Sequence, residues 1–483
     1  MNSIMKRRRC GVLLHPTSLP GGSSTGTLGT DAYRFVDFLV DGGFTVWQTL
    51  PLGPVDGHGS PYGSSSAYAG DVRLIDPASL DSLPELPVRL PFDCVREAPA
   101  AAYSAFKGLA TRAQSQQFDT FMRQHQRWVF PFGMFEVCRR EFGGKPWWSW
   151  PQPYRDRDWD ALVEIVAAGK DTFRAIVFQQ YLFELQWSAL KRYANNRGVH
   201  IFGDLPFYMD RNSVDIWWSR RFFQIGDDLE PTSVAGVPPD YFNDEGQFWG
   251  NPLYDWEALR REGFDWWRAR LEAQLRRFDL LRIDHFRALE SYWSIPAGSK
   301  SAREGHWVPG CGDELLESLH VRDGLPLVAE DLGIITDAVR TLRDRFDLPG
   351  MAVLQFGFDG SADNPHLPPN HVENSVVYTG THDNDTLRGW YESLDVGTRE
   401  YVAAVLRAGE RSMPQYLIDV SHGSRARLAI VPMQDLLDLG STARMNTPGE
   451  AEGNWRWRFA WSDVASDLAA RCHERARRYD RLV

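Results

Sequence analysis

The chain has 483 residues, of which 43% are hydrophobic, and a formal net charge of -11 at neutral pH. This length suffices for one barrel of about 250 residues with insertions. Acidic and basic residues are mixed along the chain. Because phosphate binding needs a basic face, this charge argues against a nucleic-acid partner. The sequence contains no run of about 18 apolar residues, so no membrane role is expected.

The cysteines of this chain are scattered and lack the C-x-x-C spacing of zinc sites and redox motifs. There are five, an odd number: Cys10, Cys94, Cys138, Cys311 and Cys472. We therefore expect no metal centre and no structural disulfide. A chain without disulfides is typical of a reducing compartment, and we expect a cytoplasmic location.

Eight short apolar runs, most of them separated by helical patterns, predict parallel strands. After the first run, apolar residues with helical spacing predict a helix that is capped by Thr30 and ended by Gly42 and Gly43. A strand–helix–strand order favours parallel pairing with a right-handed crossover. The sequence therefore predicts an α/β fold, a (β/α)8 TIM barrel. The predicted strands are 11–15, 45–50, 199–205, 280–283, 327–330, 351–356, 376–379 and 428–432.

Three segments interrupt or follow this alternation. Residues 77–196 are mostly helical and end in an aromatic-rich helix at 171–195, which predicts a helical subdomain inserted beside the barrel. Residues 226–254 show no periodicity and predict a long, irregular active-site loop, whose aromatic residues argue against disorder. Residues 460–483 predict a helical tail packed on the barrel. We expect the catalytic barrel to extend over 11–459.

Acidic residues follow three of the predicted strands: Asp284, Glu330 and Asp383. In barrel enzymes the chemistry lies at the C-terminal ends of the strands. Cleavage of a glycosidic bond with retention needs two carboxyl groups about 5–5.5 Å apart. Asp284 and Glu330 end consecutive strands, and neighbouring strands lie about 4.8 Å apart. An acidic residue after a strand is also often a helix cap, so spacing alone leaves the reaction open.

The surroundings of these acids suggest different roles. Arg282 lies two residues before Asp284 and thus on the same face of the strand. A guanidinium beside a carboxylate favours the ionised form, which suits a nucleophile. Glu330 follows apolar residues without an adjacent arginine, and a dry site would preserve the proton of an acid/base. Asp383, beside His382, could bind sugar hydroxyls and stabilise positive charge in the transition state.

Several motifs resemble those of the amylomaltases, the disproportionating 4-α-glucanotransferases of glycoside hydrolase family 77, related to the α-amylase superfamily. They extend over nearly the whole chain: SPYGSSSAYAG (60–70), GDLPFY (203–208), AGVPPDYF and GQFWGNPLY (235–254), RIDHFR (282–287), AEDLG (329–333), GTHDNDT (380–386) and GNWRWR (453–458). The resemblance implies a retaining transglycosylase. Such an enzyme cleaves an α-1,4 bond, forms a covalent glucosyl-enzyme and passes the chain to the 4-hydroxyl of another glucan or of glucose.

The resemblance also implies roles for individual residues. Asp284 would be the nucleophile, Glu330 the acid/base and Asp383 the transition-state stabiliser. The substrate-binding residues would be Arg282, His382, Tyr62 and Asp204 around the cleaved sugar, His285, Gln247 and Trp249 on the acceptor side, and Tyr241 and Phe242 in a covering loop. No cofactor or metal is implied. The expected partners are α-1,4-glucans and maltooligosaccharides, for a monomer or homodimer.

Two other functions use the same residues. A retaining α-1,4-glucan hydrolase would need the same carboxylates, and the long segment 226–254 favours transfer over hydrolysis, because a covering loop excludes water. A non-catalytic glucan-binding protein on a barrel scaffold is the other alternative. The presence of all three carboxylates argues against it.

Overall fold

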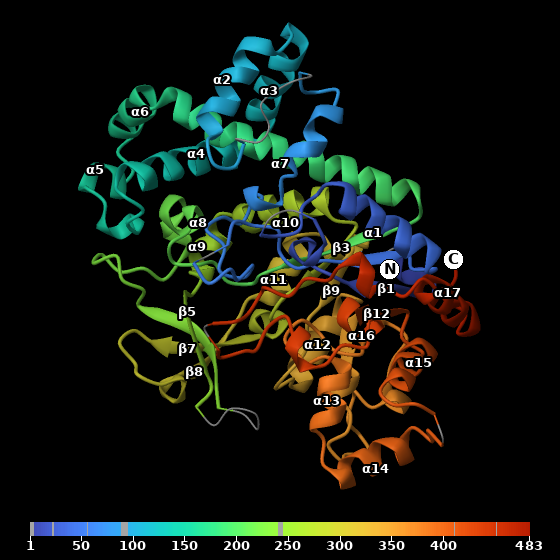
Figure 1. Cartoon of the computed structure of the whole chain (residues 1–483). Coiled ribbons are helices and arrows are strands. Elements are labelled where there is room, and N and C mark those ends of the chain that lie inside the picture. The colour runs from blue at the N-terminus through green and yellow to red at the C-terminus, as the bar shows by residue number, and fades with distance from the viewer. Residues whose placement is uncertain are drawn as a thin grey trace.

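The computed structural model describes residues 4–21, 24–55, 57–87, 95–239, 245–409, 411–450 and 452–483. Eight parallel strands follow one another in chain order around a barrel (Figure 1). The amide of Ala329 donates to the carbonyl of Pro349 (2.8 Å), directly before β10, and joins the two ends of the sheet. The predicted (β/α)8 barrel is confirmed. Its strands are β1 Arg9–Leu13, β2 Val46–Gln48, β3 His200–Leu205, β6 Leu280–Ile283, β9 Leu327–Ala329, β10 Gly350–Val353, β11 Ser375–Tyr378 and β12 Leu428–Pro432.

Each of the eight predicted strands is present, with small differences at the ends. The strand predicted at 351–356 stops at Val353, because Leu354–Phe356 turns into a 3-10 helix. Thr30 is not the cap of its helix: it is the first residue of α1 Thr30–Asp41, and Gly29 occupies the N-cap position with extended backbone angles. Gly42 caps the other end of α1, as predicted.

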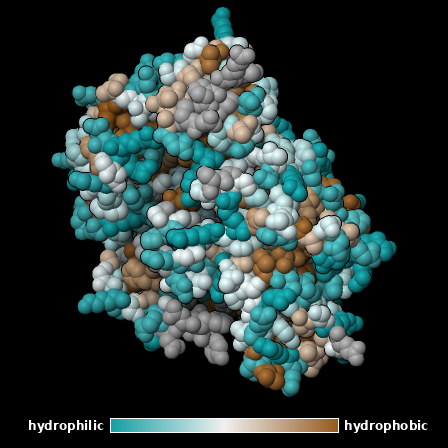
Figure 2. All heavy atoms as spheres, in the orientation of Figure 1, coloured by the Kyte–Doolittle hydropathy of each residue, from teal (hydrophilic) through white to brown (hydrophobic). Residues whose placement is uncertain are grey.

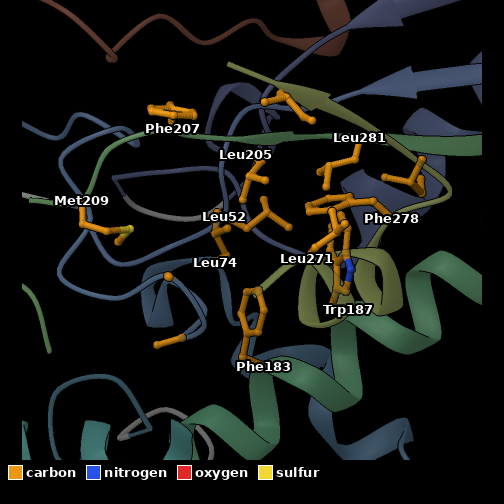
Figure 3. Packing of buried hydrophobic residues seen from close by; sticks show 14 of the residues in the cluster. Leu52, Leu74, Phe183, Trp187, Leu205, Phe207, Met209, Leu271, Phe278 and Leu281 are labelled. Atoms are coloured by element: carbon orange, nitrogen blue, oxygen red, sulfur yellow. The ribbon is translucent and has the colours of Figure 1, made fainter. Parts of the chain in front are cut away.

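A group of helices lies on one side of the barrel, drawn at the top of Figure 1. The long helix α7 connects this group to the barrel. Phe183 and Trp187 on α7 point toward barrel residues in Figure 3, and the Trp187 ring lies 5.7 Å from the Phe278 ring. A side chain at Gly203 would collide with Phe278, so glycine permits this close packing. The helices are α2 Pro99–Leu109, α3 Arg112–Gln124, α4 Gln126–Glu141, α5 Gln152–Arg155, α6 Trp159–Ala168 and α7 Lys170–Asn196.

A second, antiparallel sheet lies beside the barrel, and the sequence did not predict it. Its strands are β4 Ser233–Val237, β5 Gln247–Pro252, β7 Ser291–Pro296 and β8 His306–Pro309, in the order β5-β4-β7-β8. The expectation that 226–254 is irregular is therefore wrong for β4 and β5. Gly236 and Gly250 weaken the local strand pattern, and β4 also pairs with β7, which lies far along the chain. Tyr241 and Phe242 lie outside the described residues.

The remaining helices pack around the barrel and behind its strands. They are α8 Val214–Trp218, α9 Trp256–Arg261, α10 Asp265–Arg277, α11 Gly312–Ser318, α12 Asp337–Arg345, α13 Leu387–Ser393, α14 Val396–Val405, α15 Gln415–Gly423, α16 Met433–Leu436 and α17 Leu468–Arg478. In the tail, α17 packs against α1 and α15. The buried guanidinium of Arg481 donates to the carbonyls of His422 (2.7 Å) and Arg9 (2.8 Å), which fastens the tail to the start of β1.

The face drawn in Figure 2 is mostly hydrophilic, with small hydrophobic patches between polar side chains. Within the part of the chain that the structure describes, no helix is both long enough and apolar enough to cross a membrane.

Candidate active site

Acidic side chains gather at the C-terminal ends of three neighbouring barrel strands. Arg282 on β6 lies opposite Asp204 on β3, and Ile283 on β6 lies opposite Ala329 on β9. Asp284 and Glu330 are the next residues after these two strands. The adjacency that the sequence predicts for the two carboxylates is therefore present at the end of the barrel where such enzymes carry their chemistry.

Arg282 connects the acids of β3 and β6. Its Nη1 donates to Asp204 Oδ2 (2.6 Å), and its Nη2 forms an ion pair with Asp284 Oδ1 (2.8 Å). The Tyr62 hydroxyl, from the loop after β2, donates to the same Asp204 oxygen (2.7 Å). The side chains of Arg282 and Asp204 are buried, whereas that of Asp284 is 27% exposed. Asp284 is thus the acid of this network that is open to a ligand.

The sequence predicts an ionised Asp284 beside its own arginine. In the structure, Arg282 is shared between Asp284 and Asp204, so its charge is divided between two carboxylates. Burial raises the pKa of Asp284, the Arg282 guanidinium opposes this, and the nearby carboxylates of Asp204, Glu330 and Asp383 add to the increase. A single arginine among several carboxylates leaves excess negative charge, so the cluster holds a proton more readily than an isolated acid.

Glu330 is held by backbone amides. His285 N donates to its Oε2 (2.7 Å) and Leu332 N donates to its Oε1 (2.8 Å). Burial raises the pKa of Glu330, while Arg282 and these two amides oppose the increase. The direction agrees with the dry environment that its apolar sequence neighbours predict.

Asp383 and His382 follow β11 on the opposite side of the barrel mouth. His382 Nε2 lies 3.3 Å from Asp383 Oδ2, and the His382 ring stacks on the Tyr62 ring with centroids 5.2 Å apart. Burial lowers the pKa of His382 and Asp383 opposes this shift, so the ring is neutral at pH 7. Asn446 Nδ2 donates to Asp383 Oδ1 (2.6 Å). Sequence reasoning missed Asn446, because one asparagine in a polar loop carries no recognisable pattern.

The small sheet supplies an aromatic wall beside His285. The Trp249 ring lies 4.8 Å from the His285 ring at 78°, and Trp249 Nε1 donates to Gln247 Oε1 (3.0 Å). Tyr208 lies 6.1 Å from both rings and was not predicted, although it belongs to the GDLPFY motif. His285 adopts a left-handed backbone conformation (φ 50°), which turns its side chain toward this wall. Burial lowers the pKa of His285 to about 3, so the ring is neutral.

The predicted site residues within the described ranges thus form one connected cluster. Residues from the loop after β2, from the strand ends and from β5 all contribute, while Tyr241 and Phe242 lie outside those ranges. In the same ranges, no group of three or more His, Cys, Asp and Glu side chains is arranged to hold a metal ion. Paired carboxyl groups at barrel strand ends, with an aromatic wall beside them, define the class of glycoside-cleaving barrel enzymes.

Comparisons with known proteins narrow this class. Residues 14–463 match the family model described as 4-alpha-glucanotransferase. The 4-alpha-glucanotransferase of Thermus thermophilus is 42% identical, over 98% of this chain and 99% of that protein. That of Aquifex aeolicus is also 42% identical, over 94% and 95%. The structure of an amylomaltase from Streptococcus agalactiae in complex with acarbose is 34% identical, with a TM-score of 0.93 over 99% of this chain and 100% of that one. The chain belongs to the 4-alpha-glucanotransferase family, which confirms the enzyme class that its motifs imply.

Proposed function

We propose that this enzyme transfers a segment of an α-1,4-glucan to the 4-hydroxyl of another glucan, or of glucose, by retaining double displacement. The observation that carries this proposal is the placement of Asp284, paired with Arg282, on the strand next to Glu330. Two carboxyl groups on adjacent strand ends suit the short separation that a retaining mechanism needs.

In the first step, an oxygen of the Asp284 carboxylate attacks the anomeric carbon of the donor. The bond from this carbon to the leaving sugar's O4 breaks, and the Glu330 proton passes to that O4. The ion pair with Arg282 favours the anion on Asp284 and opposes the effect of burial there, whereas burial favours the proton on Glu330 and opposes the two amides that hold it. Charge and protons then balance, leaving a glucosyl ester on Asp284 and an ionised Glu330.

Positive charge develops on the sugar ring in the transition state. We assign its stabilisation to Asp383, whose side chain is 44% exposed and therefore accessible to a bound sugar. Tyr62, Asp204, Arg282 and His382 would surround the cleaved sugar. Their mutual hydrogen bonds and the Tyr62–His382 stacking support this assignment, because prepositioned groups need no reorganisation during the reaction.

In the second step, Glu330 takes the proton of the acceptor's 4-hydroxyl and that oxygen displaces Asp284. Water competes with the acceptor for the same intermediate. Trp249, Gln247 and His285 would exclude water and position the acceptor sugar, since a correctly held acceptor has a large effective concentration. By resemblance, Tyr241 and Phe242 would cover the bound glucan.

The wider setting follows from the same proposal. Substrates would be maltooligosaccharides and longer α-1,4-glucans, and we propose no nucleic-acid, membrane or metal partner. The four cysteines within the described ranges are free thiols, which supports a cytoplasmic location. We propose a monomer or homodimer, with the catalytic barrel over 11–459, the helical insertion at 77–196 and the helical tail at 460–483.

Incubation with pure maltotriose tests the function. We expect glucose together with maltopentaose and a ladder of longer chains, and little gain in total reducing ends. Glucose and maltose with rising reducing ends and no longer products would instead establish the hydrolase. No product at all would indicate the non-catalytic alternative, provided that a heat-treated sample and the enzyme-free substrate give the same chromatogram.

A further inference from the structure

The GNWRWR motif (453–458) has no part in the steps above, yet the loop that it closes contacts Asp383. Asn446 Nδ2 donates to Asp383 Oδ1 (2.6 Å), and Arg444 Nη2 donates to the Asp383 backbone carbonyl (2.7 Å). Both residues come from the chain after β12, far in sequence from Asp383. The loop therefore holds the residue by its backbone and by its carboxylate.

The loop is braced by its own hydrogen bonds. Asn454 Oδ1 accepts from Thr447 N (2.9 Å), and Asn454 Nδ2 donates to Glu450 O (2.8 Å). Trp455 N donates to the carbonyl of Met445 (2.8 Å), and the Met445 side chain is buried in a cluster with side chains of the barrel strands. These bonds tie both ends of the loop together beside Asn446. The amide of Asn446 is thus carried on a closed and anchored segment.

The same motif fastens the loop to the site and to the barrel. Trp455 has a left-handed backbone (φ 64°), and its ring lies 6.0 Å from the Tyr62 ring and 5.9 Å from the His382 ring. Arg458 Nη2 donates to the carbonyl of Leu19 (3.2 Å) in the loop after β1. The motif therefore connects the Asn446 loop to the Tyr62–His382 pair.

The Asp383 carboxylate needs such an external partner. Its side chain is 44% exposed, and its other oxygen, Oδ2, lies near His382, the preceding residue in the chain. A sequence neighbour moves together with Asp383 and fixes its orientation only in part. Asn446 approaches the other oxygen from a different element and thereby determines how the carboxylate is turned.

We propose that Asn446 is a positioning residue, which holds the Asp383 carboxylate in the orientation that stabilises the positive sugar ring. This inference rests on the proposed function. Displacing a catalytic group by about 1 Å can reduce a rate about 10²-fold. We therefore expect Asn446→Ala to lower kcat about 10- to 100-fold through Asp383.

A double-mutant cycle tests whether Asn446 acts through Asp383. The variants are Asn446→Ala, Asp383→Ala and the double variant, and the measurement is fluoride release from α-maltosyl fluoride with maltose as acceptor. This donor's leaving group needs little protonation, which keeps weak rates measurable. We expect Asn446→Ala to lower the rate about 10- to 100-fold when Asp383 is present and less than about threefold when it is absent. Equal losses in both backgrounds would indicate a merely structural role and overturn the proposal.

Two further variants keep the test decisive. Asn446→Asp preserves side-chain volume and removes the donor, so it should fold and should be impaired at least as much as Asn446→Ala. The matched control is Asn374→Ala, because the Asn374 amide also donates to a carboxylate (Asp347 Oδ1, 3.2 Å) but lies beside the start of β11. It should leave the rate unchanged. Wild-type rates in both Asn446 variants would overturn the proposal, while absence of a maltotriose ladder from the wild type would overturn the function instead.

Discussion

The two sides of the candidate active site differ in how firmly their side chains are held. On the barrel side, Arg282 and Asp204 are buried and joined by a charged hydrogen bond. On the side of the small sheet, Trp249 is 38% exposed and Phe248 is 50% exposed. Bond cleavage needs groups fixed to within a fraction of an ångström, whereas a wall that admits acceptors of different lengths needs only to exclude water. We therefore expect substitutions on the barrel side to lower the rate, and substitutions on the side of the small sheet to change the ratio of hydrolysis to transfer.

The largest effect on the barrel side is expected from removal of the proposed nucleophile. Asp284→Asn keeps the shape of the side chain but cannot form the glucosyl ester, so transfer and hydrolysis should both fall at least about 10⁴-fold. Maltotriose products followed by chromatography measure this. Asp337→Asn, at an almost fully exposed carboxylate on α12, is the matched control and should behave as wild type. An active Asp284→Asn would exclude covalent catalysis at this residue.

Glu330→Gln should reduce maltotriose turnover about 10²- to 10⁴-fold, because the leaving O4 then receives no proton. The initial burst of fluoride from α-maltosyl fluoride should be largely preserved. Burial raises the pKa of Glu330, so its acid form persists above the ordinary range of about 4.3 and is lost as pH rises through the raised pKa. The kcat/KM profile for maltotriose should therefore have its basic limb above that range. A fluoride burst as impaired as maltotriose turnover would contradict the acid role.

Tyr62→Phe tests the hydrogen bond that holds Asp204 on the barrel side, and it leaves the carboxylates at the reacting bond unchanged. It removes the hydroxyl that donates to buried Asp204 and preserves the ring that stacks on His382. Loss of such a bond costs about 1–3 kcal/mol, so we expect about a tenfold fall in kcat/KM. Tyr193→Phe removes a comparable bond to Asp37 (2.8 Å) at the surface and serves as control. Equal values for both variants would mean that the Asp204 bond has no role in turnover.

The smallest expected effect concerns the side of the small sheet. Trp249→Ala should raise the ratio of hydrolysis to transfer about two- to fivefold, because the wall beside His285 then admits water. Total reducing ends and chain-length distribution measure the ratio. Trp307→Ala, at a residue of equal exposure on β8, should leave it unchanged. If Trp249→Ala lowers activity with no change in the ratio, the sheet does not control partition.

The barrel and its carboxylates could be predicted because their signals are local. Each strand is a short apolar run, and Arg282 and Asp284 share a face by alternation alone. The Tyr62 and Asp204 assignments came instead from the motif resemblance, since nothing local to Tyr62 indicates a bond to a residue 142 positions away. The shared use of Arg282 by Asp204 and Asp284 could not be predicted either, because it depends on the neighbouring strand.

The small sheet and Asn446 lay beyond sequence reasoning for a related reason. Strand β4 is stabilised by pairing with β7, which follows a whole barrel strand later, and glycines interrupt its pattern. Asn446 gains its significance only from a contact with Asp383, 63 positions earlier in the chain. In both cases the determining interaction is long-range, and the local residue types are ordinary for loops.

The order of the small sheet also constrains how such an enzyme could be recombined. Strands β4 and β5 precede β6, whereas β7 and β8 follow it, so one sheet is assembled from chain on both sides of the strand that carries Arg282. The acceptor wall therefore cannot be exchanged between relatives as one continuous segment of sequence. A chimera with its crossover inside β6 would join half of one parent's sheet to half of the other's. Grafting a wall from a relative would require the two segments 233–252 and 291–309 to be transplanted together.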